Sequence, residues 1–274
     1  MTEVKNMEIL IPVLILLGIA VICAVLLTVA SVFFGVKEDE TAIAIRECLP
    51  GANCGACGYN GCDAYAKALA ENKADATNLC VPGGDKVSRE ISAILGVEAL
   101  DVEEMVAYVA CNGTCGVSEQ RYEYQGPRSC IAANLHYSGS KLCKDACLGY
   151  GDCAAACPKD AIYIEDGVAH VDSSECIGCG ICVRTCPNAI IKLIPEVAKV
   201  TVNCSNHDKG ALTRKYCANG CIGCMKCEKA CPSGAIKVQN NVATIDYSLC
   251  TSCKECVKVC PVKCIHEGCF LNHS

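Results

Sequence analysis

The chain has 274 residues, a formal net charge of −6 and 29 cysteines, but no Trp and only 3 Phe. So few large side chains cannot fill an ordinary interior for a chain of this length. The cysteines stand in tight runs rather than at scattered loop positions, which disfavours a disulfide scaffold and favours metal or iron–sulfur ligation. The acidic balance and the shortage of aromatic residues argue against nucleic acid as a partner.

The first feature in chain order is an uncharged run of 28 residues from Ile9 to Val36. This length predicts one transmembrane helix in the lipid bilayer, with residues 1–36 as an N-terminal membrane anchor. The alternative is a signal peptide, whose apolar core is only about 7–15 residues long and follows a basic segment. Because so many unpaired thiols need a reducing compartment, we expect a single-pass protein of the cell membrane with its bulk on the cytoplasmic side.

A cysteine-rich segment follows, within residues 37–99. Its cysteines have the spacing Cys-x2-Cys-x4-Cys-x17-Cys and are Cys54, Cys57, Cys62 and Cys80. Glycines beside them leave the backbone free to approach a cluster and to donate amides to its sulfurs. The spacing predicts a small 4Fe-4S domain, and a glycine-rich turn that holds structural zinc is the alternative.

The second half of the chain contains an internal repeat. With an offset of 74 residues, the segment 130–186 aligns without gaps on the segment 204–260, and nearly all their cysteines pair. The spacing Cys-x2-Cys-x2-Cys-x3-Cys-Pro begins at Cys176, Cys221 and Cys250. It puts three thiolates on one side of a tight loop, and the proline prevents the chain from continuing as a helix. The alternative is structural zinc, which needs only two Cys-x2-Cys pairs per ion. Each run has a third cysteine at the same spacing and a final Cys-Pro, and both features favour iron–sulfur clusters.

These runs resemble two-cluster ferredoxin domains, in which three thiolates of one run and the last thiolate of the other hold each cubane. The resemblance predicts two tandem two-cluster ferredoxin-like domains, over residues 143–198 and 199–274, after a connecting segment over residues 100–142. The four cysteine sets that it implies are Cys143, Cys147, Cys153 and Cys186; Cys157, Cys176, Cys179 and Cys182; Cys221, Cys224, Cys227 and Cys260; and Cys231, Cys250, Cys253 and Cys256.

The first of these sets departs from the family pattern. The first repeat has Tyr150 where the second has Cys224, so we take Cys143 as the replacement. Cys217 is the repeat counterpart of Cys143 and competes with Cys224 for the same iron, and we favour Cys224.

Several cysteines remain outside the five predicted sets. Cys264 is expected to be a small core residue. A sixth cluster is left open, and its candidate ligands are Cys111, Cys115, Cys130 and Cys204.

The sequence contains no feature of bond-making catalysis. No glycine-rich dinucleotide fingerprint precedes a helix, so we expect no flavin or nicotinamide on this chain and no catalytic residue. Electron relay is the function that remains, because each iron–sulfur cluster can accept and donate one electron. Residues 199–274 contain 10 Lys and Arg against 5 Asp and Glu. The lysines near the C-terminal clusters are a candidate docking surface for an acidic redox partner, with a merely solvated face as the alternative; they are Lys226, Lys229, Lys254 and Lys258.

The order of an apolar anchor, the motif "LPGANCGACGYNGC" and then ferredoxin modules resembles the B subunit of the Rnf complex, the membrane-bound ion-translocating ferredoxin:NAD oxidoreductase. The resemblance implies an α+β chain that accepts electrons from reduced ferredoxin and relays them to membrane and flavin-bearing partner subunits. In the complex, this flow is coupled to NAD reduction and to Na+ or H+ translocation. The alternatives are a polyferredoxin subunit of a hydrogenase or heterodisulfide reductase, and a zinc scaffold without a redox role.

Overall fold

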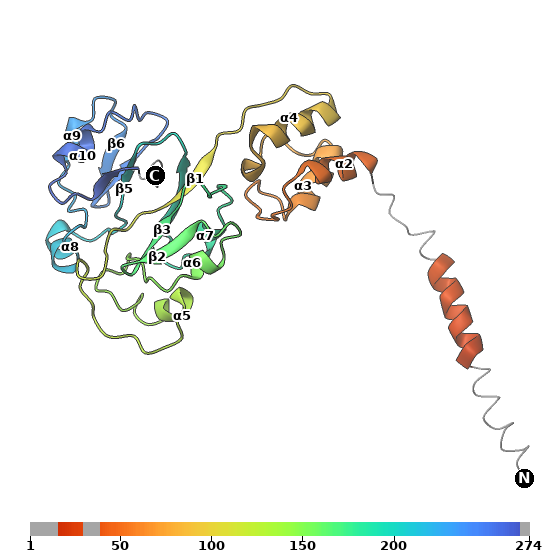
Figure 1. Ribbon diagram of the computed structural model, residues 1–274, viewed down its shortest axis with the longest axis horizontal. Helices are drawn as coiled ribbons and strands as arrows, with labels where there is room; N and C mark the ends of the chain where they lie inside the picture. Colours follow the sequence, from red (N-terminus) through yellow and green to blue (C-terminus); the bar gives the residue numbers. More distant parts are fainter. Residues whose placement is uncertain (1–15, 30–38, 269–274) are drawn as a thin grey trace, which may run out of the picture.

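The computed structural model describes residues 16–29 and 39–268, in which short helices and two-stranded sheets are mixed, as predicted (Figure 1). Residues 16–29 form a helix with exposed apolar side chains, Leu27 at 72%. Over the described ranges, none of the helices has both the length and the apolar character needed to cross a membrane. The predicted span from Ile9 to Val36 extends at both ends into residues outside those ranges.

A small helical unit carries the first predicted cysteine set. It consists of α2 (Glu40–Cys48), α3 (Cys62–Ala70), the 3-10 turn η1 (Val81–Gly83) and α4 (Gly84–Leu95). Its core is built on Ile45, Tyr65 and Ile91, all fully buried, and two cysteines of the set, Cys62 and Cys80, pack against them. The apolar faces of the helices therefore fix one side of the cysteine loops.

Beyond residue 100 the strands form antiparallel pairs. β1 (Met105–Val109) pairs with β4 (Ile191–Pro195), β2 (Ile162–Glu165) with β3 (Val168–Val171), β5 (Val200–Val202) with β8 (Ile265–Glu267), and β6 (Ile236–Gln239) with β7 (Val242–Ile245). The helices of this part are α5 (Cys130–Asn134), α6 (Asp152–Ala155), α7 (Ile181–Thr185), α8 (Gly210–Tyr216), α9 (Lys226–Ala230) and α10 (Glu255–Val259). We call the part closed by the β1–β4 pair the first unit and the part closed by the β5–β8 pair the second unit.

The two units repeat each other in structure. The second-unit elements α9, β6, β7, α10 and β8 begin 74 residues after the first-unit elements α6, β2, β3, α7 and β4. The closing strands break this offset: Val109 pairs with Ile191, and Val202 with Ile265, although Val109 and Val202 are 93 positions apart. The first unit therefore contains an insertion after β1, which includes α5. By this register, the structural counterpart of Cys204 is Cys111.

Tight loops with positive φ connect these short elements. Gly149 has φ +73°, and a Cβ there would lie 2.6 Å from the carbonyl oxygen of Gly167. Gly116 has φ +86°, but a Cβ there would meet nothing within 4 Å. The two glycines share a backbone conformation and differ in steric surroundings.

Replacing these glycines separates the two effects. We expect Gly149→Ala to lower the unfolding temperature more than Gly116→Ala, because left-handed strain of about 1–2 kcal/mol applies to both and only the former adds a backbone clash, about 1–3 kcal/mol. Thermal unfolding of the anaerobically purified protein, followed by circular dichroism, measures the difference. Equal decreases would show that the Gly149–Gly167 approach does not constrain the loop.

Candidate iron–sulfur sites

Four thiols converge in the helical unit. Burial raises the pKa of Cys80 to about 11, and the nearby charges of Cys62, Cys54 and Cys57 add to the effect, while the amide of Gly83 opposes it. A metal centre that takes thiolates would suit thiols crowded in this way, because its binding replaces their protons. The structure thus brings together all four residues of the predicted set.

The loop of this site depends on Asn53 and Gly61. Asn53 Oδ1 accepts a hydrogen bond of 2.8 Å from the amide of Cys62, which begins α3. A Cβ on Gly61 would lie 2.9 Å from the same oxygen, and Gly61 has φ +116°. A side chain at Gly61 would therefore displace the group that orients Cys62.

Four small cavities beyond residue 100 are each lined by four cysteines. Their empty volumes are nearly equal, at about 350, 330, 340 and 320 Å³. Two of them are lined by sets that the ferredoxin spacing predicts, namely Cys157, Cys176, Cys179 and Cys182, and Cys231, Cys250, Cys253 and Cys256. Within residues 16–29 and 39–268, no three Cys, His, Asp or Glu side chains stand close enough to hold a single metal ion. Each cavity instead leaves room between its four sulfurs.

The three Cys-x2-Cys-x2-Cys loops share one backbone geometry. The residues two and four positions after the first cysteine have positive φ in every loop, and they are Gly178 and Gly180, Gly223 and Met225, and Ser252 and Lys254. Alternation of left-handed and right-handed residues turns successive amides toward one centre and creates an anion-binding concavity. This arrangement suits a cluster whose sulfurs and thiolates are negatively charged.

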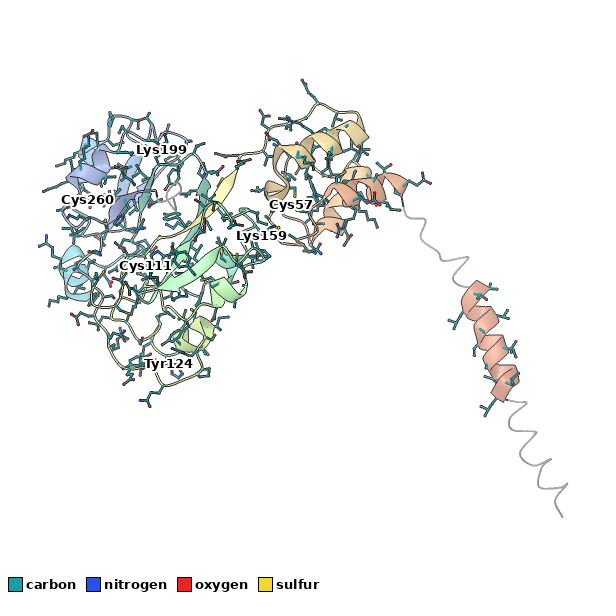
Figure 2. The ribbon with its side chains drawn as sticks, in the orientation of Figure 1. Cys57, Cys111, Tyr124, Lys159, Lys199 and Cys260 are labelled. Atoms are coloured by element: carbon teal, nitrogen blue, oxygen red, sulfur yellow. The ribbon has the colours of Figure 1, made fainter. Side chains whose placement is uncertain are left out.

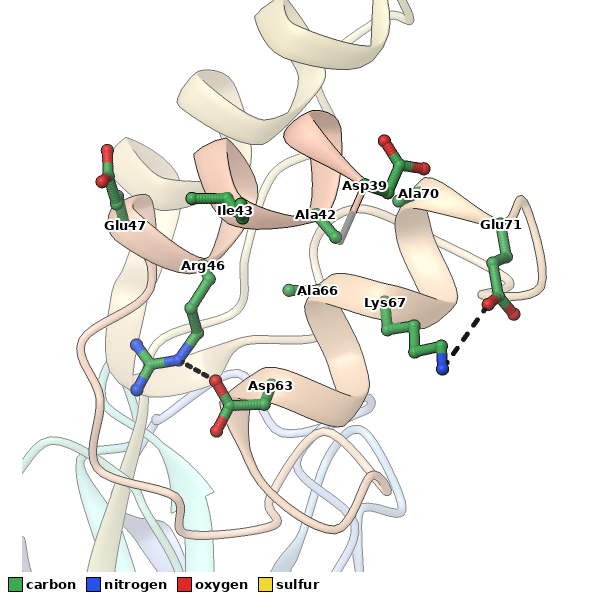
Figure 3. Close-up of a pocket in the computed structure, with 10 residues that line it drawn as sticks. All are labelled: Asp39, Ala42, Ile43, Arg46, Glu47, Asp63, Ala66, Lys67, Ala70 and Glu71. Carbon is green, nitrogen blue, oxygen red and sulfur yellow. Dashed lines mark hydrogen bonds and ion pairs between the residues drawn. The ribbon is translucent and has the colours of Figure 1, made fainter. Parts of the chain in front are cut away.

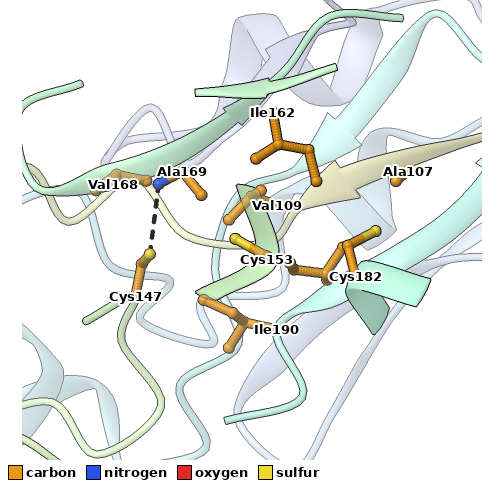
Figure 4. Packing of buried hydrophobic residues seen from close by; sticks show 10 residues of the cluster. Ala107, Val109, Cys147, Cys153, Ile162, Val168, Ala169, Cys182 and Ile190 are labelled. Atoms are coloured by element: carbon orange, nitrogen blue, oxygen red, sulfur yellow. Dashed lines mark hydrogen bonds between the residues drawn. The ribbon is translucent and has the colours of Figure 1, made fainter. Parts of the chain in front are cut away.

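Apolar side chains pack against the cysteines of the first unit. Val109, Ile162 and Ile190 pack around Cys153 and Cys182 in one buried cluster (Figure 4). Burial raises the pKa of Cys153 to about 12 and that of Cys182 to about 11. The amide of Ala169 donates to the sulfur of Cys147 at 3.4 Å, as the dashed line in Figure 4 shows. Apolar surroundings and amide hydrogen bonds to sulfur tune the reduction potential of a bound cluster.

The cavity around Cys147 requires a correction to the predicted set. It is lined by Cys130, Cys147, Cys153 and Cys186, and the charges of Cys147, Cys130 and Cys186 act on Cys153. Cys143, which we chose from the sequence, lies beside Cys111 and Cys204 instead. The physical reason is the insertion, which folds back as α5 and supplies the missing thiol from a more distant position.

Asp152 holds Cys130 in place. Its Oδ2 accepts hydrogen bonds from Ser129 Oγ at 2.8 Å and from the amide of Ile131 at 3.0 Å, so one carboxylate binds the residues on both sides of Cys130. These contacts and the Cys130 amide keep the pKa of Asp152 below its usual value despite partial burial. Asp152 begins α6, which carries Cys153, and so it links two residues of the same set.

In the second unit, Cys221, Cys224, Cys227 and Cys260 lie together. The charges of Cys221 and Cys224 act on Cys227, and that of Cys260 acts on Cys221. Cys217 lies apart from them, in the cavity that also contains Cys143. The structure thus places Cys224, rather than its competitor, in this set.

The sequence did not indicate that Cys264 touches two members of this set. Cys264 is buried, as expected, and its sulfur lies 3.6 Å from that of Cys260. A hydrogen bond from its single thiol proton, to one sulfur or the other, lowers the pKa of Cys221 and of Cys260. The first unit has Ile190 at the corresponding place, so this contact distinguishes the two units.

A larger open groove, with an empty volume of about 1200 Å³, is lined by residues of both α2 and α3 (Figure 3). Ala42, Ile43 and Ala66 line it together with the ion pair between Arg46 and Asp63, at 2.6 Å. No cysteine lines this groove, so it is not a cluster site.

The revised set is testable by iron counting. If Cys130 and Cys186 hold the same cluster, Cys130→Ala/Cys186→Ala should lose no more iron than Cys186→Ala alone, about four atoms per chain. The control, Cys130→Ala/Cys260→Ala, affects two clusters and should lose about eight. Iron and sulfide content after anaerobic purification is the measurement, and an additive loss in the first pair would contradict a shared site.

The contact of Cys264 predicts a change in potential without loss of the cluster. Cys264→Ala removes a thiol that can donate to either of two sulfurs, so the reduction potential of this cluster should become more negative while the iron content stays unchanged. Cys264→Ser retains a donor and should shift it less. Redox titration followed by electron paramagnetic resonance measures both, and identical potentials in all three proteins would rule out the interaction.

Comparisons with known proteins identify iron–sulfur domains over the same parts of the chain. A family model described as "Putative Fe-S cluster" matches residues 49–82, and models described as "4Fe-4S dicluster domain" match residues 141–187, 175–236 and 220–264. The chain therefore contains several 4Fe-4S ferredoxin-type domains.

Full-length relatives extend the comparison. The chain is 45% identical over 258 residues to the B subunit of the Na(+)-translocating ferredoxin:NAD(+) oxidoreductase complex of Acetobacterium woodii, covering 94% of this chain and 77% of that protein. It is 40% identical over 247 residues to the B subunit of the proton-translocating ferredoxin:NAD(+) oxidoreductase complex of Clostridium ljungdahlii, covering 90% and 86%. It is 39% identical over 252 residues to the B subunit of an ion-translocating oxidoreductase complex of Methanosarcina acetivorans, covering 92% and 95%. The chain belongs to this family, the B subunits of ion-translocating ferredoxin:NAD(+) oxidoreductase complexes.

Proposed function

We propose that the chain is the iron–sulfur relay of such a complex: it accepts electrons from reduced ferredoxin and passes them to membrane and flavin-bearing partner subunits. The observation that carries the proposal is the series of sets in which four cysteines converge on one place. A 4Fe-4S cluster bound to such a set supplies one-electron redox chemistry. The names of the relatives associate electron flow through the assembled complex with NAD reduction and with translocation of Na+ or protons.

The proposed cluster ligands form five sets of four cysteines each. Four are as the sequence predicts, and the fifth contains Cys130 in place of Cys143. The apolar run from Ile9 to Val36 supports a single-pass attachment to the cell membrane, with the cysteine-rich part on the cytoplasmic side.

Contacts between the helical unit and the first unit support a direct path between their clusters. Burial raises the pKa of Cys179, and the charge of Cys54 contributes, which requires that the two sulfurs be near each other. Arg184 of α7 donates a hydrogen bond to the carbonyl of Cys54. The first set of the chain therefore adjoins the set that contains Cys179.

Exposure supports electron entry at the other end. Among the proposed ligands, the exposed ones are Cys224 and Cys253, and both belong to the second unit. Lysines follow them closely in sequence, at Lys226 and Lys254. An exposed ligand beside positive charge suits an acidic donor such as ferredoxin, because the field steers the encounter and the short distance permits transfer.

Ion pairs divide the four candidate docking lysines into two kinds. Lys254 pairs with Glu267, and Lys258 pairs with Glu255 at 2.7 Å, so their charges are largely offset. Lys226 and Lys229 are exposed and take part in none of the ion pairs found in the described ranges. We therefore assign the attraction of ferredoxin mainly to Lys226 and Lys229.

Charge reversal tests this docking surface. Lys226→Glu/Lys229→Glu should slow reduction by ferredoxin about tenfold at low salt, and the difference from wild type should shrink at high salt as screening increases. Stopped-flow absorbance of the intact complex mixed with reduced ferredoxin is the measurement.

The matched control places the same charge change on α4. Lys86 and Arg89 are exposed in the helical unit, away from the proposed surface, and Lys86→Glu/Arg89→Glu should leave the rate near that of wild type. Equal slowing by both double variants would mean that net charge, rather than this surface, controls the encounter.

A further inference from the structure

The remaining four-cysteine cavity lies between the two units and belongs to none of the five sets. It is lined by Cys111, Cys143, Cys204 and Cys217, and its empty volume of about 330 Å³ is close to those of the other three. The sixth set left open by the sequence differs from it, because Cys130 lines another cavity and Cys115 is exposed. Figure 2 shows Cys111 within the body that the two units share, far from Cys57 of the helical unit.

The first pair of cysteines in this cavity is equivalent by structure. Cys111 and Cys204 each stand two residues after the last residue of the closing strand of their unit. The amide of Cys147 donates to Cys111 Sγ at 3.4 Å, and the amide of Cys221 donates to Cys204 Sγ at 3.2 Å. Cys147 and Cys221 are themselves repeat counterparts, so the two contacts are the same contact made twice.

The second pair is equivalent by sequence. Cys143 and Cys217 each stand four residues before those counterparts, Cys147 and Cys221. Each unit therefore contributes one copy of the same two cysteines, and the two copies meet at the interface.

Backbone amides converge on all four sulfurs. Each sulfur accepts from the amide two residues further along the chain: Gly113 for Cys111, Asp145 for Cys143, Asn206 for Cys204 and Asn219 for Cys217. Two of the four, Cys143 and Cys204, are also buried, with 7% and 8% of their surface exposed. Sulfurs that are buried yet supplied with donors suit thiolates that a metal centre stabilises.

Two buried polar side chains point to a negatively charged occupant. Ser118 lines the cavity with 6% of its surface exposed, and its Oγ has no hydrogen-bond partner. Lys141 is 4% exposed beside the cavity, where its charge acts on Cys217. Its Nζ donates to the carbonyls of Gly113 at 2.7 Å and Gly167 at 3.1 Å, and no carboxylate of the described chain pairs with it. A buried cation and a free donor are costly unless an anionic group lies next to them.

We propose that Cys111, Cys143, Cys204 and Cys217 hold a sixth 4Fe-4S cluster at the interface of the two units. The proposal rests on the relay function above and supplies the step that joins the units. One side of the site contacts Cys147 of the first unit, and the other contacts Cys221 of the second. A cluster held there would supply one-electron redox chemistry, which needs no bond formed or broken, between the set that contains Cys147 and the set that contains Cys221.

Iron and sulfide content of the wild-type chain, purified anaerobically, is the first test. Six clusters correspond to about 24 iron atoms per chain, and five correspond to about 20. About 20 would overturn the interface cluster and leave the relay proposal standing. A folded chain without iron or sulfide would overturn both.

Single substitutions then identify the ligands. Cys204→Ala should lose about four iron atoms, whereas the control Cys115→Ala should lose none, because Cys115 lines none of the four cavities. Full iron content in Cys204→Ala would overturn the ligand set.

Ser118→Ala keeps the test decisive if the cysteine variant does not fold. It removes a hydroxyl donor without touching a ligand, so iron content should remain that of wild type. The reduction potential of one cluster should become more negative, as redox titration with electron paramagnetic resonance detects. A titration in which every cluster keeps its wild-type potential would overturn the placement of a cluster beside Ser118.

Discussion

The structure depends on burying sulfur in a low-dielectric interior and supplying it with backbone amides. Cysteines stand among the buried residues of the three larger cores, and in one of them Cys153 and Cys182 pack with Val109 and Ile162 as aliphatic side chains do elsewhere. A buried thiol resists ionisation, as the raised pKa values of Cys143 and Cys153 show. Amides and a metal centre remove that penalty together. The short helices and strongly curved loops follow from this constraint, because several amides reach one point only where the backbone alternates between left-handed and right-handed conformations.

The arrangement of the cysteine sets follows from two units that repeat each other except for one insertion. The second unit repeats the first at an offset of 74 residues, except that the first carries the insertion after β1. The insertion supplies Cys130 to the cluster site of Cys147 and contains Ser118, which lines the interface cavity. Equivalent cysteines of the two units meet at that interface. In our proposal, a duplicated module therefore provides both its own cluster sites and a further site between the copies.

The arrangement also gives the relay two unlike ends. At the N-terminal end, Cys54 adjoins Cys179, and the predicted membrane anchor precedes the helical unit. At the C-terminal end, Cys224 and Cys253 are exposed beside lysines. In our proposal, a water-soluble donor meets the second unit while partner subunits meet the helical unit. Electrons then cross the whole chain, so that the contact between the units is as necessary to function as either unit.

Cysteine spacing by itself determined the nature of the cofactor, the repeat and those sets whose members lie within one loop or in paired runs. It did so because short spacings leave the backbone few ways to arrange three thiolates. The set around Cys147 and the cavity of Cys111 were decided only by tertiary structure. Their members come from segments joined by an insertion and from two different units, and loop closure over such separations costs nearly the same for Cys130 as for Cys143. The contacts of Asp152 with the start of α5 decide that Cys130 joins the set of Cys147. The strand register aligns Cys111 with Cys204 at the interface. No local sequence pattern encodes either arrangement.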